Sequence, residues 1–317
     1  MITYDFEKPI AELERKISEL RKYAAEVNID ASAELSSLER KRDVLSQEVY
    51  HALAPFQRVQ VARHPQRPYM LDYLRLICTD FMELHGDRRF ADDQALLGGF
   101  ATLDGRRVLV LGHQKGRDVK ENMRRNFGMA HPEGYRKALR LMTLADRAGL
   151  PIVSFIDTPG AYPGIGAEER GQAEAIAVNL RDTMGLGVPV LCVVIGEGGS
   201  GGALGIGIGN RVLIMEHAYY SVISPEGCAS ILFHDAKRAA EAATALKLTA
   251  RDLLQFGIVE EIIAEPIGGA HRNPEQAAQL VKAALVRHLD ELCAMPPDAL
   301  RQQRYEKFRR VGVFSEA

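Results

Sequence analysis

Apolar residues recur at helical spacing through two charged stretches near the start of the chain. The first set is Ile10, Leu13, Ile17 and Leu20, and the second, after the turn-like segment Asn28-Ile29-Asp30, is Leu35, Leu38, Leu45 and Val49. This spacing predicts a helical hairpin from Pro9 to about Leu53. Each helix carries only one apolar stripe, so we expect the arm to pack on the main domain or on a partner chain.

A break in this pattern at Pro65 and Pro68 suggests a domain boundary. We therefore divide the chain into an N-terminal helical arm, 1–62, and a main domain, 63–317. A new amphipathic segment begins near Leu71. The runs 97–103 and 106–112 flank Asp104-Gly105, which predicts a β-hairpin.

Buried strands, glycine-rich turns and helices then alternate. Strands are expected at 152–157, 190–195, 211–215, 219–224 and 257–263, an alanine-rich helix at about 168–184, and a charged helical tail at about 273–308. Such alternation is typical of an α/β domain with a largely parallel sheet and crossover connections.

Composition and charge narrow the classes of function. The chain has 46% hydrophobic and 26% charged residues, a net charge of −2 and a pI near 6.5, so no nucleic-acid partner is predicted. Its four cysteines form no Cys-x-x-Cys pair, and no metal site is predicted. The N-terminus lacks the pattern of a signal peptide and no long apolar run occurs, which favours a cytoplasmic protein without a membrane partner.

Two glycine-rich loops, 158–166 and 196–209, follow predicted strands. If Gly201, Gly202 and Ala203 begin a helix, their N–H groups have no partner within it and the helix dipole adds positive charge. This arrangement predicts a site for a developing oxyanion. The alternative is that the glycines only permit close packing of a helix on the sheet.

The second loop also contains the spacing of a dinucleotide-binding fingerprint. Gly196, Gly198 and Gly201 match it, and Glu216 is a candidate ribose ligand. The match falls in the middle of the domain instead of in an opening βαβ unit. No Gly-Lys dipeptide occurs, which excludes a Walker-type phosphate loop.

A nucleophile elbow is the other pattern in this loop. Gly198-x-Ser200-x-Gly202 fits it, and Asp235 and His271 follow in the order that such hydrolases use. A serine hydrolase of ClpP-like or crotonase-like fold using Ser200 is therefore the alternative function. We expect Ser200 to cap a helix instead.

A basic stretch precedes the first glycine loop. It contains Lys115, Arg117, Lys120, Arg124, Arg125, Arg136, Lys137 and Arg140. These side chains could meet the phosphates of coenzyme A, a carboxylate or an acidic partner protein, or could form a solvated helix face. We interpret His113 as a semi-buried histidine with its hydrogen bonds satisfied, and assign no role to His85, His131 or His271.

Three long motifs carry a resemblance to a known family. They are 157–164 with 166–172, 196–204 and 221–232, and shorter matches at 112–116, 125–129 and 268–274 extend the likeness over nearly the whole chain. In these motifs the chain resembles the α subunits of bacterial acetyl-CoA carboxylase carboxyltransferase.

The resemblance implies a crotonase-type (ClpP-like) core, a spiral of ββα units, with an N-terminal helical hairpin and a C-terminal helical tail. It implies an α2β2 assembly with a β subunit that carries zinc, and work with a biotin carboxyl carrier protein and biotin carboxylase. The substrates would be carboxybiotin on the carrier and acetyl-CoA, the product malonyl-CoA for fatty acid synthesis, and no cofactor would be bound covalently to this chain.

The resemblance also assigns residues. It places one oxyanion site at the backbone N–H groups of Gly201, Gly202 and Ala203. Substrate contacts are expected at Gly160, Ala161, Tyr162, Gly164, Gly198, Gly199, Ser200, Arg124 and Arg125. No side-chain base is needed, because biotin can take the methyl proton once carbon dioxide has left.

Overall fold

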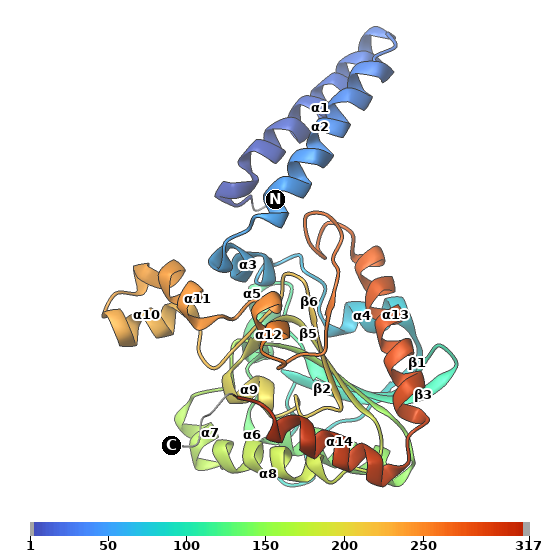
Figure 1. Cartoon of the computed structure of the whole chain (residues 1–317), viewed down its shortest axis with the longest axis vertical. Helices are drawn as coiled ribbons and strands as arrows, with labels where there is room; N and C mark the ends of the chain where they lie inside the picture. Colours follow the sequence, from blue (N-terminus) through green and yellow to red (C-terminus); the bar gives the residue numbers. More distant parts are fainter. Residues whose placement is uncertain (1–2, 313–317) are drawn as a thin grey trace.

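The computed structural model describes residues 3–312, so the predicted ranges 1–62 and 63–317 both extend outside the described residues. At one end of the molecule two antiparallel helices project as a long arm (Figure 1). They are α1 (Lys8–Val27) and α2 (Ser32–His51), which confirms the predicted hairpin. Asn28 ends α1 in the left-handed conformation, with φ 52°.

The arm buries apolar residues mainly at its base. Ile10, Tyr50 and Leu53 form one cluster with Val61 of α3 (Pro55–Ala62). At the far end Tyr23 is 55% exposed. Helix α3 itself packs on the main domain, because Val59 and Ala62 contact Tyr219 and Leu248. The boundary between 62 and 63 stays a prediction.

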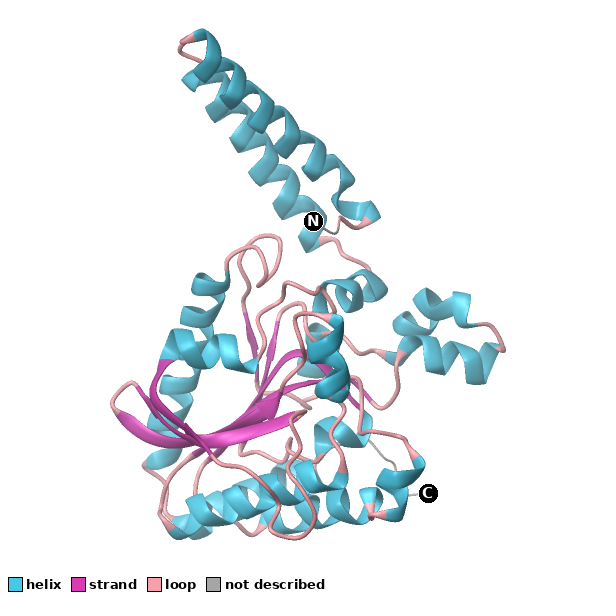
Figure 2. Ribbon diagram, turned by 180° about the vertical axis from the view of Figure 1, so that it is seen from behind, coloured by secondary structure: helices cyan, strands magenta, loops and turns pink. Residues whose placement is uncertain are grey.

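One twisted sheet forms the centre of the main domain, with helices on both of its faces (Figure 2). Its strands are β1 (Cys78–Glu83), β2 (Leu96–Leu103), β3 (Arg106–His113), β4 (Ile152–Thr158), β5 (Val190–Gly199), β6 (Arg211–Met215), β7 (Tyr219–Ser221) and β8 (Glu261–Ile263). The order is β1-β2-β3-β4-β5-β6-β8, and β7 pairs with β5. Strands β1 to β3 are antiparallel, and the pairs from β3 through β8 are parallel.

Strand β5 belongs to two ladders. Its first half pairs with β6, from Leu191 to Val194, and its last three residues, Glu197 to Gly199, pair with the short strand β7. Every residue of β4 and β5 is buried. The continuous apolar runs in the sequence arise from this burial on both faces, as expected for central parallel strands.

The remaining helices connect or cover the strands. They are α4 (Met70–Ile77), α5 (Val119–Arg124), α6 (Pro132–Arg147), α7 (Ile165–Glu169), α8 (Gln172–Met184), α9 (Ser200–Leu204), α10 (Pro225–Phe233), α11 (Ala239–Leu246), α12 (Ala250–Gln255), α13 (Pro274–Cys293) and α14 (Pro297–Arg309), with short 3-10 turns at Asp5–Glu7, Asn126–Gly128 and Ala236–Arg238. Helices α10 and α11 form a second, smaller projection (Figure 1). No helix among residues 3–312 combines the length and apolar character needed to cross a bilayer.

Several predicted elements are shorter or divided in the structure. The helix expected at 168–184 is interrupted at Gly171, whose φ of 81° starts α8 separately. The strand expected at 219–224 ends at Ser221, because Ser224 caps α10 through a hydrogen bond from the Gly227 amide. The strand expected at 257–263 begins only at Glu261, since the residues before it form the turn that closes α12.

The predicted helical tail is confirmed, and a buried arginine attaches it to the core. Arg304 of α14 donates to the carbonyls of Thr183, Leu186 and Val188 at 2.8, 2.9 and 3.0 Å, and to Asn210 Oδ1 at 2.6 Å. These carbonyls lie at and beyond the C-terminus of α8, where helix carbonyls lack internal partners. The charged tail is thus part of the main domain's packing.

Candidate active site

The two glycine-rich loops leave neighbouring parallel strands at the same edge of the sheet. Ile156 of β4 lies opposite Val194 of β5, and Thr158 lies opposite Gly198. Carboxyl ends of adjacent parallel strands are where ligands bind in open α/β sheets. The loops that the sequence singled out therefore meet where a binding site is expected.

Two glycines are required by the contact between these loops. A Cβ on Gly199 would lie 2.1 Å from the Pro159 carbonyl oxygen, and a Cβ on Gly202 would lie 2.4 Å from the Ala161 nitrogen and the Gly160 carbonyl carbon. In contrast, a Cβ on Gly201 would meet only Ile176, at 3.7 Å. The packing explanation thus applies to Gly199 and Gly202 but not to Gly201.

Helix α9 begins directly at the end of β5, and its start differs from the prediction. Gly199 is the N-cap residue, so the expectation that Ser200 caps the helix is wrong. Ser200 instead takes a left-handed backbone conformation with φ 54°, which is uncommon for a residue with a Cβ. Such strained positions cluster at functional sites.

The amides of Gly201, Gly202 and Ala203 lie in the first turn of α9. Outside the helix, none of the three donates a hydrogen bond to another residue within 3–312. Ser200 and Gly201 line an apolar cavity of about 300 Å³ with Tyr220 and Leu253, whereas Gly202 and Ala203 are buried. Of the three predicted donors, Gly201 thus stands at the wall of a cavity.

Side chains beneath the loop contact the Gly202 peptide. The Tyr135 hydroxyl donates to the Gly202 carbonyl at 3.3 Å, and Asn179 donates to the Gly205 carbonyl at 2.9 Å. Because the Gly202 carbonyl belongs to the same peptide group as the Ala203 amide, Tyr135 fixes the direction in which that amide points.

His113 is not the satisfied, semi-buried histidine that was expected. Its ring is completely buried, and neither ring nitrogen makes a hydrogen bond of normal geometry to the described residues. Burial and then the neighbouring Lys115 charge lower the pKa of His113 to about 3, and the adjacent Gly202 backbone opposes this only in part. The ring is therefore neutral and a poor base at neutral pH.

A buried ionic network holds the two strand ends together. Lys115 Nζ contacts Asp157 Oδ1 at 2.7 Å and Glu197 Oε1 at 2.9 Å, and Arg63 Nε contacts Glu197 Oε2 at 2.8 Å. Burial alone would raise the pKa of Glu197, but Lys115 and Arg63 hold that pKa at about 2. Sequence reasoning missed Asp157 and Glu197, although both stand at the ends of neighbouring predicted strands.

Only part of the predicted substrate contacts in the first loop lies against the second loop. Gly160 and Ala161 pack against Gly202. The Tyr162 amide donates to the Ala130 carbonyl at 3.0 Å, and its ring stacks on His131 with centroids 4.3 Å apart. Gly164 lies against the Tyr162 ring, and Gly198 lies against the Tyr220 ring.

The predicted basic stretch is divided among several environments. Lys115 joins the buried network, and Arg125 is fixed by Glu121 and by the Gln94 carbonyl, at 3.0 Å each. Arg124 is exposed, and it lines a different cavity from that of Gly201, about 190 Å³ in volume. The structure therefore does not bring Arg124 or Arg125 to the wall of the cavity beside α9.

The structure shows the backbone geometry of a nucleophile elbow at Ser200 but not the side-chain partners that a triad needs. The φ of Ser200 resembles that of an elbow serine. His271, however, stacks on His64 with centroids 3.8 Å apart, and Asp235 caps a short turn through the Lys237 amide. Within residues 3–312, His271 and Asp235 thus have other partners and Ser200 forms no hydrogen bond to a histidine, so no triad is assembled.

The dinucleotide-binding interpretation also lacks its proposed ribose ligand near the glycine loop. Glu216 lines a separate cavity with Tyr50 and His217, and none of the residues of that cavity belongs to the glycine loops. No group of three or more histidine, cysteine or acidic side chains within 3–312 is arranged to hold a metal ion.

Comparison with known proteins gives full-length matches. A family model described as acetyl co-enzyme A carboxylase carboxyltransferase-like matches residues 3–312. A Synechococcus elongatus protein is 58% identical over 316 residues, covering 100% of this chain and 97% of its own length. A Thermus thermophilus protein is 57% identical over 312 residues, covering 98% and 99%. Both are named acetyl-coenzyme A carboxylase carboxyl transferase subunit alpha.

Solved structures agree on the fold. A transcarboxylase 12S structure with methylmalonyl-coenzyme A and methylmalonic acid bound aligns with TM-score 0.54 at 20% identity, over 71% of this chain and 44% of that chain. A Pseudomonas malonate decarboxylase hetero-tetramer in complex with coenzyme A aligns with TM-score 0.56 at 19% identity, over 70% and 88%. The predicted crotonase-like fold is confirmed by these neighbours.

Proposed function

The chain belongs to the acetyl co-enzyme A carboxylase carboxyltransferase-like family, and we propose that it is the α subunit of an acetyl-CoA carboxylase carboxyltransferase. The enzyme moves a carboxyl group from N-carboxybiotin to the methyl carbon of acetyl-CoA, giving malonyl-CoA. The observation that carries this proposal is the start of α9, where Gly201 lines a cavity at the carboxyl end of β5.

This reaction depends more on groups that stabilise negative charge than on a side-chain base. A carbon–nitrogen bond of carboxybiotin breaks, a carbon–carbon bond forms at the methyl group, and the methyl proton passes to the biotin nitrogen. Negative charge develops on the thioester oxygen as that proton leaves. Backbone N–H groups held by rigid surroundings stabilise such an oxygen without reorganising, and losing one donor lowers the rate ~10²- to 10³-fold.

The proposed roles follow from what each residue contacts. The amides of Gly201, Gly202 and Ala203 would supply one oxyanion site, for which we favour the enolate oxygen. Gly160 and Ala161 would hold the Gly202 peptide from the other loop, and Ser200 and Gly201 would face the substrate. Arg124 and Arg125 remain proposed phosphate contacts only if a partner brings substrate to α5.

The proposal includes partners. The active site would lie between this chain and a homologous β subunit in an α2β2 assembly, with zinc on the β subunit. A biotin carboxyl carrier protein would deliver carboxybiotin, which a biotin carboxylase regenerates. These proteins, and this chain with them, would be cytoplasmic.

Reconstitution tests the shared site. The purified chain should form no malonyl-CoA by itself, and activity should appear when a β-type subunit is added with carboxybiotin and acetyl-CoA. A fluorophosphonate probe should leave Ser200 unlabelled, because no base activates its hydroxyl. Full activity of the isolated chain, or labelling of Ser200 accompanied by ester hydrolysis, would contradict the proposal.

A further inference from the structure

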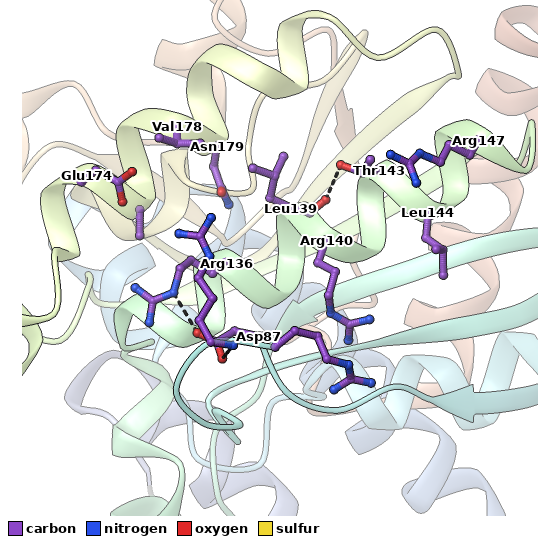
Figure 3. A pocket seen from close by; sticks show the side chains of 13 residues that line it. Asp87, Arg136, Leu139, Arg140, Thr143, Leu144, Arg147, Glu174, Val178 and Asn179 are labelled. Carbon is purple, nitrogen blue, oxygen red and sulfur yellow. Dashed lines mark hydrogen bonds and ion pairs between the residues drawn. The ribbon is translucent and has the colours of Figure 1, made fainter.

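A second cavity lies on the helical layer, between the loop 87–89, helix α6 and helix α8 (Figure 3). Its volume is about 440 Å³, and it shares no lining residue with the cavity beside α9. Five arginines line it, against the two carboxylates of Asp87 and Glu174: Arg88, Arg89, Arg136, Arg140 and Arg147. We call this cavity the arginine basin.

Three of the basin's arginines come from one face of α6. Arg140 lies one helical turn beyond Arg136, and Arg147 lies two turns beyond Arg140, so the three side chains face the same side of the helix. In Figure 3 their side chains extend from α6 with the guanidinium groups of Arg136 and Arg140 directed toward the loop that carries Asp87. Two of these residues belong to the basic stretch that the proposed function left without a role.

Backbone carbonyls hold several of these guanidinium groups in place. Arg140 donates to the carbonyls of Gly86 and His85, at 3.1 Å each, and Arg88 donates to the same His85 carbonyl at 2.8 Å. Two like charges therefore share one neutral acceptor. Arg136 donates to Asp87 Oδ2 at 2.8 Å and to the Arg170 carbonyl at 3.0 Å.

Two carboxylates face five arginines, so the negative charge in the basin neutralises this cluster only in part. The other oxygen of Asp87 accepts from the amides of Arg89, Phe90 and Ala91, so that carboxylate is already engaged with its own loop. Within residues 3–312, the side chains of Arg89 and Arg147 form no ion pair or hydrogen bond, and both are exposed. Their N–H donors are available to an anion.

We propose that the arginine basin binds the phosphates of a nucleotide. Arginine presents planar pairs of N–H donors that match phosphate oxygens, and the preset guanidinium groups lose little freedom on binding. The volume is within the range of small-molecule sites. Leu139, Leu144 and Val178 add an apolar wall that a base can contact. The nucleotide is either free or the nucleotide end of coenzyme A.

Titration calorimetry on the full chain with ATP, coenzyme A and inorganic tripolyphosphate tests the site. Because all three probes carry phosphates, each should bind saturably, and its affinity should fall as the salt concentration rises. The double variant Arg89→Ala/Arg147→Ala should weaken ATP binding by about tenfold or more, since two charge-assisted contacts are lost. The matched control, Arg75→Ala/Arg107→Ala, removes two exposed arginines elsewhere and should leave the affinity unchanged.

The same titrations identify the source of the nucleotide. If coenzyme A displaces ATP and binds at least as tightly, the basin holds the nucleotide end of the acyl-CoA. If ATP and tripolyphosphate bind but coenzyme A does not, the ligand is a free nucleotide. If none of the three probes binds saturably, the proposal is overturned. A site for an acidic protein would give this result. Equal weakening in both double variants also overturns the proposal. The binding readout does not depend on carboxyl transfer, so it can fail while the proposed function stands.

Discussion

Replacing Gly202 by alanine separates the role of this glycine from that of Gly201. The added Cβ would lie 2.4 Å from two backbone atoms of the opposite loop, whereas an ordinary contact needs at least 3.4 Å. Neither Gly160 nor Ala161 can yield by rotating a side chain, because the atoms met belong to the backbone. One or both loops must therefore move by about 1 Å, and overpacking of this kind costs ~1–3 kcal/mol in unfolding free energy.

The loss should fall mainly on the rate of transfer. A displacement of about 1 Å in a positioning group can lower a rate by ~10²-fold. We therefore expect Gly202→Ala to lower kcat by roughly two orders of magnitude, with a smaller change in KM for acetyl-CoA, and to unfold only a few degrees below the parent, ~2–5 °C. The assay is malonyl-CoA formation by the chain reconstituted with a β-type subunit, with thermal unfolding measured on the same preparations.

Gly201→Ala is the matched control. Its methyl group would meet only Ile176 at 3.7 Å, and the Gly201 amide is retained. This variant should keep kcat within about threefold of the parent, a difference of well under 1 kcal/mol. The reasoning fails if folded Gly202→Ala transfers carboxyl groups at the parental rate, or if Gly201→Ala is as inactive as Gly202→Ala.

Three further predictions follow from the supporting contacts. Tyr135→Phe removes the donor to the Gly202 carbonyl and should lower kcat by roughly three- to tenfold with KM unchanged, as measured by steady-state kinetics; an unchanged kcat would show that Tyr135 does not orient the peptide. The pKa of Glu197 is about 2 in the folded protein, compared with an ordinary value of 4.5. Ionised Glu197 therefore stabilises the fold above about pH 4.5, and this contribution is lost as the pH falls toward 2. When the pH is lowered from 6 to 3, the unfolding free energy measured in urea should thus fall less for Glu197→Gln than for the parent. An equal fall in both proteins would contradict this. Arg304→Met removes the side-chain donor to four backbone carbonyls near the end of α8 and should lower the unfolding free energy by about 3 kcal/mol or more, whereas exposed Arg309→Met should not, as thermal unfolding of both variants can test.

Much of the fold could be predicted from the sequence because the central strands of the sheet are buried on both faces. The runs 152–157 and 190–195 are continuously apolar, and Asp104-Gly105 marks the hairpin between β2 and β3. Strand β1 escaped prediction because its residues alternate between half-buried and exposed positions and lack an apolar run. Its place at the edge of the sheet depends on pairing with β2, which local sequence does not encode.

The site was only partly predictable for a related reason. A dense glycine loop after a strand indicates a backbone binding site, and the structure places Gly201 at a cavity wall. The contacts that hold this loop join segments that are far apart in the sequence, such as Lys115 with Asp157 and Glu197. Those contacts depend on the register of β4 against β5, which charge patterns along the chain do not show. The sequence therefore left open whether Lys115 meets a phosphate, a carboxylate, an acidic partner protein or solvent.

The glycines of the second loop differ in what they do, although the sequence presents them as one cluster. Gly199 and Gly202 allow the two loops to touch through their backbones, and any side chain there would push the loops apart. Gly201 has room for a methyl group, so its selection cannot rest on space within this chain. Its proposed contribution is the backbone amide, which an alanine at this position would keep. The two kinds of glycine can therefore be distinguished by substitution, because only a side chain at Gly199 or Gly202 should displace the loops and so lower the rate of carboxyl transfer.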